Sequence, residues 1–282
     1  YITIPVAYGA IFHGIIKDSM AAAGLEVSLD LIWKTNWMAG LTMIVGLAIG
    51  WFLYSKPREY KMDELSEESF EMEDPELTSA HIFAVIAGIA ALVVQLLTGS
   101  LPLGALAGLA IMIISRSIKW NQVEEMLNGG IKMMGLIAFV MLVASGYATV
   151  INATGGVPSL VDAAVTAFGG SKLVGATVMI VLGLLITMGI GTSFGTVPVV
   201  AAIYVPLAMK LGFSPAATIF LITVAAALGD AGSPASDTTL GPTSGLNADG
   251  QHDHIWDTCV PQFICYDIPL LIVGIIWPLI LG

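Results

Sequence analysis

The sequence predicts an all-α polytopic membrane protein, some of whose helices are discontinuous. Hydrophobic residues make up 56% of the 282 residues and charged residues only 11%, whereas a soluble domain is nearer a quarter charged. Most of the chain is therefore suited to lipid. Two long apolar runs, 173–210 and 216–246, are also interrupted by glycine, proline and hydroxyl residues. Such breaks survive in a membrane only where protein buries them or where they line a wet cavity.

Apolar runs of helical length set out the expected elements. An interrupted helix is expected over 1–16, a mixed loop over 17–36, and a spanning helix over 37–54 with aromatic residues at both ends, as membrane interfaces favour. Later segments are expected as apolar helices at 82–97, 103–114, 133–151 and 259–281, surface helices at 120–127 and 158–168, and a polar loop at 247–257. Cys259 and Cys265 lie in the last apolar run and are expected to pack there without a disulfide.

Residues 55–79 are expected to form an acidic linker. Nine acidic and three basic residues lie between Lys56 and Glu76, and they contribute more than half of the net charge of −11. Such a charge run is typical of a solvated segment, and nothing in the chain is basic and aromatic enough to predict nucleic-acid binding. Lysine and arginine are more frequent on the linker's side, which favours a cytoplasmic linker in a multi-pass protein of the plasma (cell inner) membrane.

A four-residue match links the two ends of the chain. Ile32-Trp33-Lys34-Thr35 recurs as Ile255-Trp256-Asp257-Thr258, and each copy stands between a broken apolar stretch and a terminal span. An odd number of expected spans separates the copies, so they face opposite ways, as inverted repeats do. Residues 1–54 would end the first repeat, 55–79 would link the repeats, and 80–282 would form the second repeat. The hairpin of the first repeat would precede Tyr1, so an N-terminal part is expected to be missing.

Two carboxylates flank the small residues of the break near residue 232. They are Asp230 and Asp237, with Ser233, Ser236 and Thr238 beside them. A carboxylate at membrane depth is costly and is functional by default, and oxygen ligands suit small hard cations. Because burial disfavours the charged form of a carboxyl group, such a group can hold either a proton or Na⁺. The alternative is that these side chains cap a half-helix.

The other interrupted run, 173–210, carries the motif GIGTSFGT at 189–196. Three glycines in eight residues disfavour a continuous helix. We therefore predict a re-entrant hairpin with Thr192 and Ser193 at its tip, and the hydroxyl cluster of Thr192, Ser193 and Thr196 would complete the cation site at the break. Two full spans are the alternative for the helices, and packing hydroxyls bonded to their own backbone are the alternative for the side chains.

A polar cluster precedes the last span. His252, Asp253 and His254 follow Asn247, and a lone His13 lies in the first broken stretch. These residues are candidates for gating or substrate contacts. A structural loop, proton handling and a metal site are the three interpretations of the cluster, and a buried structural histidine is the alternative for His13.

An intramembrane aspartyl protease is the enzyme class that needs weighing. Such enzymes use a Tyr-Asp and a Gly-x-Gly-Asp motif, and the chain has Tyr266-Asp267 and Leu228-Gly229-Asp230. Position 227 is alanine, however, and the order of the two motifs is reversed. We therefore predict that the protein is not an enzyme.

The stretches GIGTSFGTVPVVAAIYVPLAMKLG and GDAGSPASDTTLGPTSGLNADGQHDHIWDT resemble the NhaC-type Na⁺/H⁺ antiporter family, within the ion transporter superfamily. The likeness covers essentially the whole chain. It implies two inverted repeats, each with a re-entrant hairpin and a discontinuous helix, and cation binding between Thr192, Ser193 and Thr196 on one element and Asp230, Ser233 and Asp237 on the other. The branch with NADGQHDHIWDT also resembles proteins proposed to move amino acids, histidine among them.

We therefore expect a secondary active transporter that exchanges Na⁺ for H⁺ by alternating access, with Na⁺ at Asp230 and Asp237. The alternative is Na⁺- or H⁺-coupled transport of an amino acid or carboxylate. No cofactor is predicted, since Na⁺ and H⁺ are transported or coupling ions. The expected partners are the lipid bilayer, these ions, a small organic solute in the alternative case, and a second copy of the chain in a homodimer.

Overall fold

A computed structural model describes residues 2–6, 8–55, 78–125, 156–246 and 251–282, with isolated residues between 126 and 155. All regular secondary structure in this described part is helical, which confirms the all-α fold class. The helices long and apolar enough to cross a membrane are Leu29–Tyr54, Ser79–Thr98, Lys172–Ile190, Ser193–Lys210 and His254–Leu281. The protein is therefore a polytopic membrane protein. Most of the acidic linker and of the 133–151 run lies outside the described residues.

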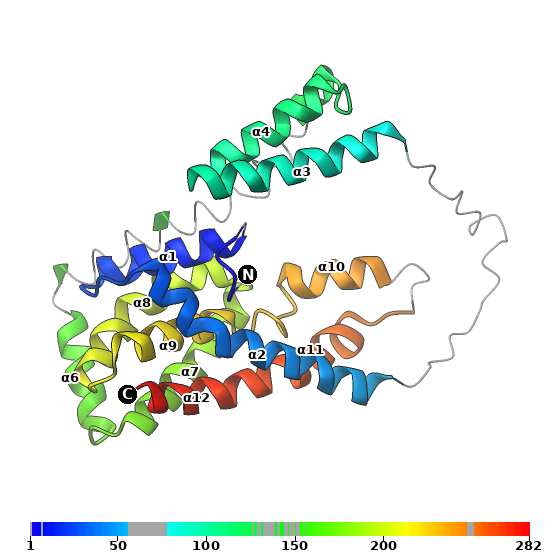
Figure 1. Cartoon of the computed structure of the whole chain (residues 1–282). Helices are drawn as coiled ribbons and strands as arrows, with labels where there is room; N and C mark the ends of the chain where they lie inside the picture. Colours follow the sequence, from blue (N-terminus) through cyan, green and yellow to red (C-terminus); the bar gives the residue numbers. More distant parts are fainter. Residues whose placement is uncertain are drawn as a thin grey trace. The chain divides into compact units, whose positions relative to one another are not determined.

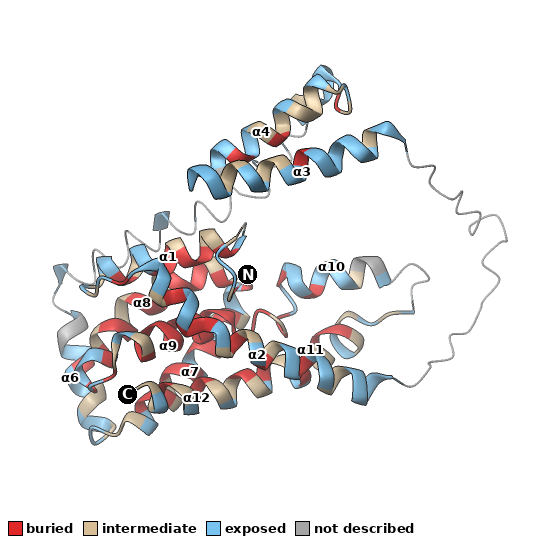
Figure 2. Ribbon diagram, in the orientation of Figure 1, coloured by how far each residue is buried: buried red, intermediate tan, exposed pale blue. Residues whose placement is uncertain are grey.

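The chain divides into two compact units, 59–136 and 1–58 together with 137–282 (Figure 1). In the first of these, α3 (Ser79–Thr98) and α4 (Leu101–Ile114) pack side by side as the sequence predicts. Gly99 ends α3 in the left-handed conformation, with φ 66°. Residues 120–125 form a further helical stretch. Most residues of α3 and about half of those of α4 are exposed (Figure 2), as is typical of apolar surfaces that contact lipid or other protein.

The other unit begins with α1 (Tyr8–Ala22) and α2 (Leu29–Tyr54). The prediction of a loop over 17–36 is wrong, because α1 continues to Ala22 and α2 begins at Leu29. Ser28 caps α2 by accepting a hydrogen bond from the Leu31 N–H at 3.1 Å. Asp30 binds Lys34 one turn further on. The polar residues that suggested a loop are therefore the first turns of a helix.

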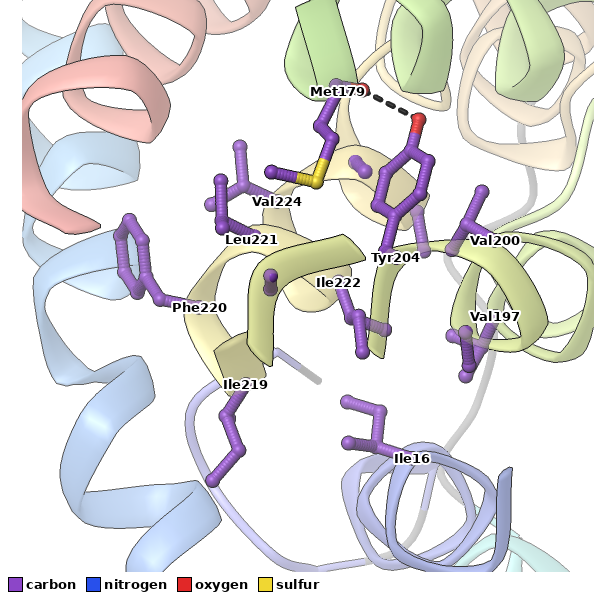
Figure 3. Close-up of a cluster of buried hydrophobic side chains, with 14 of the residues drawn as sticks. Ile16, Met179, Val197, Val200, Tyr204, Ile219, Phe220, Leu221, Ile222 and Val224 are labelled. Carbon is purple, nitrogen blue, oxygen red and sulfur yellow. Dashed lines mark hydrogen bonds between the residues drawn. The ribbon is translucent and has the colours of Figure 1, made fainter. Parts of the chain in front are cut away.

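The core of this unit surrounds α9 (Pro215–Ala227), which is buried along its whole length from Ala217 (Figure 2). Helices α7 (Lys172–Ile190), α8 (Ser193–Lys210), α12 (Ile268–Leu281) and α2 all contact it. Figure 3 shows its apolar side chains among those of α7 and α8, where the Tyr204 hydroxyl donates to the Met179 carbonyl at 2.5 Å. Helix α6 (Gly156–Ala167) lies against α8, and its Asp162 pairs with Lys210.

The last helix runs from His254 to Leu281 but is not α-helical throughout. It consists of the π-helical turn η2 (His254–Cys259), α11 (Val260–Gln262), the π-helical turn η3 (Phe263–Asp267) and α12. Pro261 and Pro269 lie inside this helix, each just after a π-helical turn, and proline cannot donate the backbone hydrogen bond expected within a helix. The predicted polar loop over 247–257 is therefore too long, because His254 already starts the helix. A single turn of π-helix within a helix is frequent at functional sites.

Close backbone packing holds α7 against α9. A Cβ added at Gly183 would overlap the Ala225 side chain, and the Thr187 hydroxyl donates to the Ala225 carbonyl at 2.7 Å. Gly189, in the same helix, has nothing within 4 Å of an added Cβ. Gly183 and Gly189 therefore differ in whether the fold needs them to be small.

We predict that Gly183→Ala lowers the free energy of unfolding by about 1–3 kcal/mol, because the added methyl group overpacks a filled contact. Gly189→Ala, the matched control, should leave it unchanged or raise it by up to about 1 kcal/mol, since alanine favours a helix over glycine. Thermal unfolding of the purified protein in detergent measures both. Equal midpoints for the two variants would contradict the packing of α7 on α9.

Candidate ion site at a helix break

The candidate site lies where two interruptions of the helices meet. Helix α9 ends at Ala227 and α10 (Asp237–Leu246) begins at Asp237, so residues 228–236 form a break. Gly229 in this break has φ 82°, a left-handed conformation that glycine adopts without strain. Helix α7 ends at Ile190, Gly191 follows it with φ 72°, and α8 begins at Ser193. The sequence thus predicted both interruptions at the correct places.

Hydrogen bonds join the α7–α8 turn to the break. The Ser193 hydroxyl donates to one carboxylate oxygen of Asp230, and the Ser236 hydroxyl donates to the other at 2.5 Å. The Ser233 hydroxyl donates to the Met188 carbonyl at 3.0 Å. Gly191 lies so close that an added Cβ would be 2.9 Å from the Ala235 carbonyl oxygen. Asp230 is only 7% exposed, so its carboxylate is held between two separate elements.

The remaining hydroxyls of the motif serve the backbone. Thr238 donates to the Asp230 carbonyl at 2.6 Å, and Thr239 donates to the Ser236 carbonyl at 2.9 Å. Thr196 donates to the Thr192 carbonyl at 2.9 Å, within its own helix. The carbonyls of Ser236 and Thr192 also accept backbone N–H groups at the starts of α10 and α8, so these hydroxyls reinforce the two helix starts, while Thr238 supplies a donor for the Asp230 carbonyl inside the break.

Asp237 does not join the group around Asp230. It is exposed and opens the first turn of α10, where a negative side chain suits the partial positive charge of a helix N-terminus. The structure therefore brings together Asp230, Ser193 and Ser236, with Ser233 and Thr238 nearby. It leaves Asp237 and the hydroxyls of Thr192 and Thr196 outside the carboxylate's contacts.

A second buried acid, Asp267, is absent from the predicted site. Its carboxylate accepts a hydrogen bond from the Gly229 N–H at 3.1 Å, and its other oxygen lies against Gly232, 2.5 Å from where a Cβ would be. Asp267 is fully buried in η3. A signal was present in the sequence, since an acid within the apolar run 259–281 is costly in lipid. Sequence reasoning mentioned it only as part of a protease motif.

The histidine cluster connects the last helix to the break. His254 contacts the Pro234 carbonyl oxygen at 2.8 Å and the Thr243 hydroxyl at 2.8 Å. His252 contacts the Thr258 hydroxyl at 2.7 Å, and Thr243 and Thr258 are hydrogen-bonded to each other at 3.0 Å. Within the described residues, no three histidine, cysteine or acidic side chains are placed to hold a metal ion together.

The other candidate residues have structural contacts or lie outside the described part. Asp253 caps η2 by accepting hydrogen bonds from the Ile255 and Trp256 N–H groups. His13 is fully buried, and its Nε2 contacts the Ile2 carbonyl oxygen at 2.7 Å, which ties down the segment before α1. Asn247 lies outside the described residues.

A cavity of about 650 Å³ opens beside Asp230. Residues 2–4, α2, the break and the last helix contribute to its lining. Most of the lining is apolar. The volume lies within the range of sites that bind small organic molecules, so the candidate site at Asp230 borders a space large enough for an organic solute.

The geometry suits the exchange of a proton for a small cation. Each carboxylate oxygen has two lone pairs, and each serine hydroxyl can either donate a hydrogen bond or turn its oxygen toward a cation. Oxygen ligands of this kind prefer hard ions such as Na⁺. The contacts join two elements, so a change of occupant at Asp230 would alter how the α7–α8 turn binds the break.

Discontinuous membrane helices around a buried carboxylate define the class of protein as one with a transporter architecture. More particularly, the chain belongs to the Na⁺/H⁺ antiporter family, whose model matches residues 1–275. This confirms the resemblance seen in the sequence. The description of this family is that of transporters and not of proteases.

Several relatives match nearly the whole chain. A protein of Bacillus subtilis named "Putative amino acid transporter YuiF" is 48% identical over 287 residues, which cover 100% of this chain and 64% of the relative. An uncharacterized membrane protein of Vibrio parahaemolyticus is 48% identical with the same coverage. One of Haemophilus influenzae is 46% identical over 97% of this chain and 63% of its own length. The chain thus spans just under two thirds of these relatives, and no solved structure matches it.

We predict that Asp267→Ala destabilises the protein by about 1–3 kcal/mol, because the buried Gly229 N–H would lose its acceptor. Asp267→Asn keeps an oxygen in that position and should cost clearly less. Thermal unfolding in detergent compares the two variants with the unmodified protein. If alanine and asparagine destabilise equally, the hydrogen bond to Gly229 does not hold the break.

Proposed function

We propose that this protein exchanges Na⁺ for H⁺ across the membrane, with Asp230 as the group that binds either ion. One observation carries the proposal: a buried carboxylate accepts hydrogen bonds from serines of two separate elements, Ser193 in α8 and Ser236 in the break. Membership of the Na⁺/H⁺ antiporter family supports it. One carboxyl group that must release H⁺ to take Na⁺ is sufficient for exchange.

In this proposal Asp230, Ser193 and Ser236 form the first set of ligands. Ser233, Thr192, Thr196 and Thr238 shape the two turns that hold them. Alternating access would come from movement of the α7–α8 turn relative to the break. Both α7 and α8 are long and apolar enough to span a membrane, so a re-entrant position of this pair stays a prediction.

The packing of α2 against the last helix supports the inverted-repeat part of the proposal. Trp37 lies edge-on to Trp277 with ring centroids 5.9 Å apart, while Gly46 and Gly50 lie against Cys265. The two helices therefore run antiparallel, and they carry the matched sequences Ile32–Thr35 and Ile255–Thr258. Antiparallel packing of corresponding segments is what inverted repeats require. We place the linker in the cytoplasm and the protein in the plasma membrane as parts of the same proposal.

The test is a pH-sensitive dye inside proteoliposomes that contain the whole protein. Adding Na⁺ outside, with no organic solute present, should move protons. Asp230→Asn should reduce this movement to background. Ser193→Ala should weaken the apparent Na⁺ affinity about tenfold, since a hydrogen bond to a charged group contributes about 1.5 kcal/mol or more.

Variants at two further aspartates serve as comparisons in this experiment. Asp162→Asn is the control, because Asp162 forms an exposed ion pair with Lys210 far along the chain from the site and exposed pairs contribute little. Asp237→Asn tests whether one acid or two acids bind the transported ion. Because Asp237 is exposed, we expect the Asp237→Asn variant to keep its exchange activity. A loss equal to that of Asp230→Asn would instead show that Asp237 is a second ion ligand. Absence of Na⁺-driven proton movement in the unmodified protein would exclude antiport.

A second candidate is the Na⁺- or H⁺-coupled transport of an amino acid or another small organic solute. The cavity beside Asp230 favours it, and the Bacillus subtilis relative is named as an amino acid transporter. Uptake of radiolabelled histidine into the same proteoliposomes, driven by an inward Na⁺ or H⁺ gradient, tests this candidate. Uptake that disappears in Asp230→Asn would support coupling through the same carboxylate.

A further inference from the structure

The cavity beside Asp230 has a polar end and an apolar body. Asp230, Thr238, Gln262 and Tyr266 contribute the polar end, and residues of α2 such as Ile44 contribute to the apolar body. Thr3 adds one hydroxyl on the α2 side, where it donates to the Asn36 carbonyl at 3.3 Å. The residues of the polar end are neighbours: Thr238 donates to the Asp230 carbonyl at 2.6 Å, and the Gln262 amide donates to the Thr238 carbonyl at 3.3 Å. Tyr266 follows Gln262 by about one helical turn.

The charge of this lining selects one kind of ligand. Asp230 is the one ionisable acid among the described lining residues, and none of them is lysine, arginine or histidine. A carboxylate, an amide oxygen and hydroxyl oxygens are all acceptors, and an ammonium group offers three donors and no acceptor. An organic anion would find no positive partner in this lining and would meet the negative charge of Asp230.

The apolar body complements the uncharged part of such a ligand. Trp37 and Tyr266 add aromatic surface, which also attracts cations. A cavity of about 650 Å³ accommodates more than a bare metal ion. Because most of its wall is apolar, the hydrocarbon part of a ligand is what can cover that wall. The cavity therefore matches a molecule with a charged ammonium end and an apolar end.

We propose that this cavity binds small organic ammonium ions, with the ammonium group at Asp230 and the apolar group against α2. The inference rests on the proposed function in one respect, that Asp230 is the cation-binding group. Because both ligands need the same carboxylate, organic ammonium ions and Na⁺ exclude each other. The apolar group supplies affinity that Na⁺ lacks.

The first experiment measures the thermal unfolding midpoint of the purified whole protein in detergent without Na⁺. Methylammonium, butylammonium and phenethylammonium are the probes. Ligands that bind the folded state raise the midpoint. Each methylene that enters the cavity should tighten binding about fourfold, and Asp230→Asn should abolish the effect. Equal effects of methylammonium and phenethylammonium would overturn the proposal.

A second set of probes identifies the charged group that is recognised. The three probes share an aromatic body and differ in their charged groups. Phenethylammonium carries an ammonium group, 3-phenylpropionate carries a carboxylate, and phenylalanine carries both. Phenethylammonium should bind most tightly, phenylalanine more weakly, and 3-phenylpropionate not at all. Comparable binding of phenylalanine and phenethylammonium would assign the site to amino acids through their ammonium group. Binding of 3-phenylpropionate at the level of phenethylammonium would overturn the proposal.

A matched pair of substitutions on α2 locates the apolar body. Ile44 lines the cavity, whereas Leu47, one turn away, is not among its lining residues, and the two side chains are 65% and 62% exposed. Ile44→Trp should reduce the preference for phenethylammonium over methylammonium by about tenfold, because the added ring occupies part of the space. Leu47→Trp should leave that preference unchanged. A loss in both variants, or in neither, would contradict the assignment.

The outcomes separate this inference from the proposed exchange of Na⁺ for H⁺. If Na⁺ moves protons in proteoliposomes but phenethylammonium neither raises the unfolding midpoint nor inhibits that movement, the inference fails and the exchange stands. If phenethylammonium stabilises the protein through Asp230 while Na⁺ moves no protons, the exchange fails and the cavity keeps its assigned ligand.

Discussion

The structure depends on one constraint, that backbone groups exposed by a helix break must find partners away from water. The break after α9 meets this constraint from three directions. Asp267 of the last helix accepts from the Gly229 N–H, hydroxyls of the break bond its own carbonyls, and His254 contacts the Pro234 carbonyl oxygen. Unsatisfied groups of this kind cost several kcal/mol each in lipid. The break therefore exists only where α7, α8 and the last helix converge on it.

The same convergence explains the position of Asp230. Its neighbour Gly229 is fixed by Asp267, and its own carbonyl is fixed by Thr238, so the carboxylate points toward Ser193 of α8. A site held in this way is rigid in its backbone but adjustable in its hydroxyls. Rotation of two serine hydroxyls is a small change, yet it determines whether the α7–α8 turn can bind a neutral or a charged group at Asp230.

Local patterns in the sequence predicted the parts of this arrangement that depend on neighbouring residues. Glycine and hydroxyl clusters located both interruptions, and apolar run length located α3, α4, α7, α8 and α9. The errors have physical causes. Residues 28–36 look like a loop because helix-capping and ion-pairing residues are polar. Residues 254–257 look like a loop because they include the polar His254 and Asp257, which hydrogen-bond neighbouring groups from within the helix. The contact of Asp267 with Gly229 joins residues 38 positions apart, which no local pattern reveals. Asp230 and Asp237 look alike in sequence, and only the packing of the turn buries one of them.

The position of the cavity bears on the kind of coupling that is physically available. Asp230 is both the acceptor of the two serines and part of the cavity wall. If Na⁺ binds at Asp230 as proposed, a solute whose cationic group uses Asp230 must displace Na⁺, and the two ligands then compete. A solute that contacts the apolar wall without using Asp230 leaves Na⁺ in place, and the bound ion can then neutralise an anionic group of the solute. Exchange and cotransport therefore differ in which atoms lie directly beside the Asp230 carboxylate.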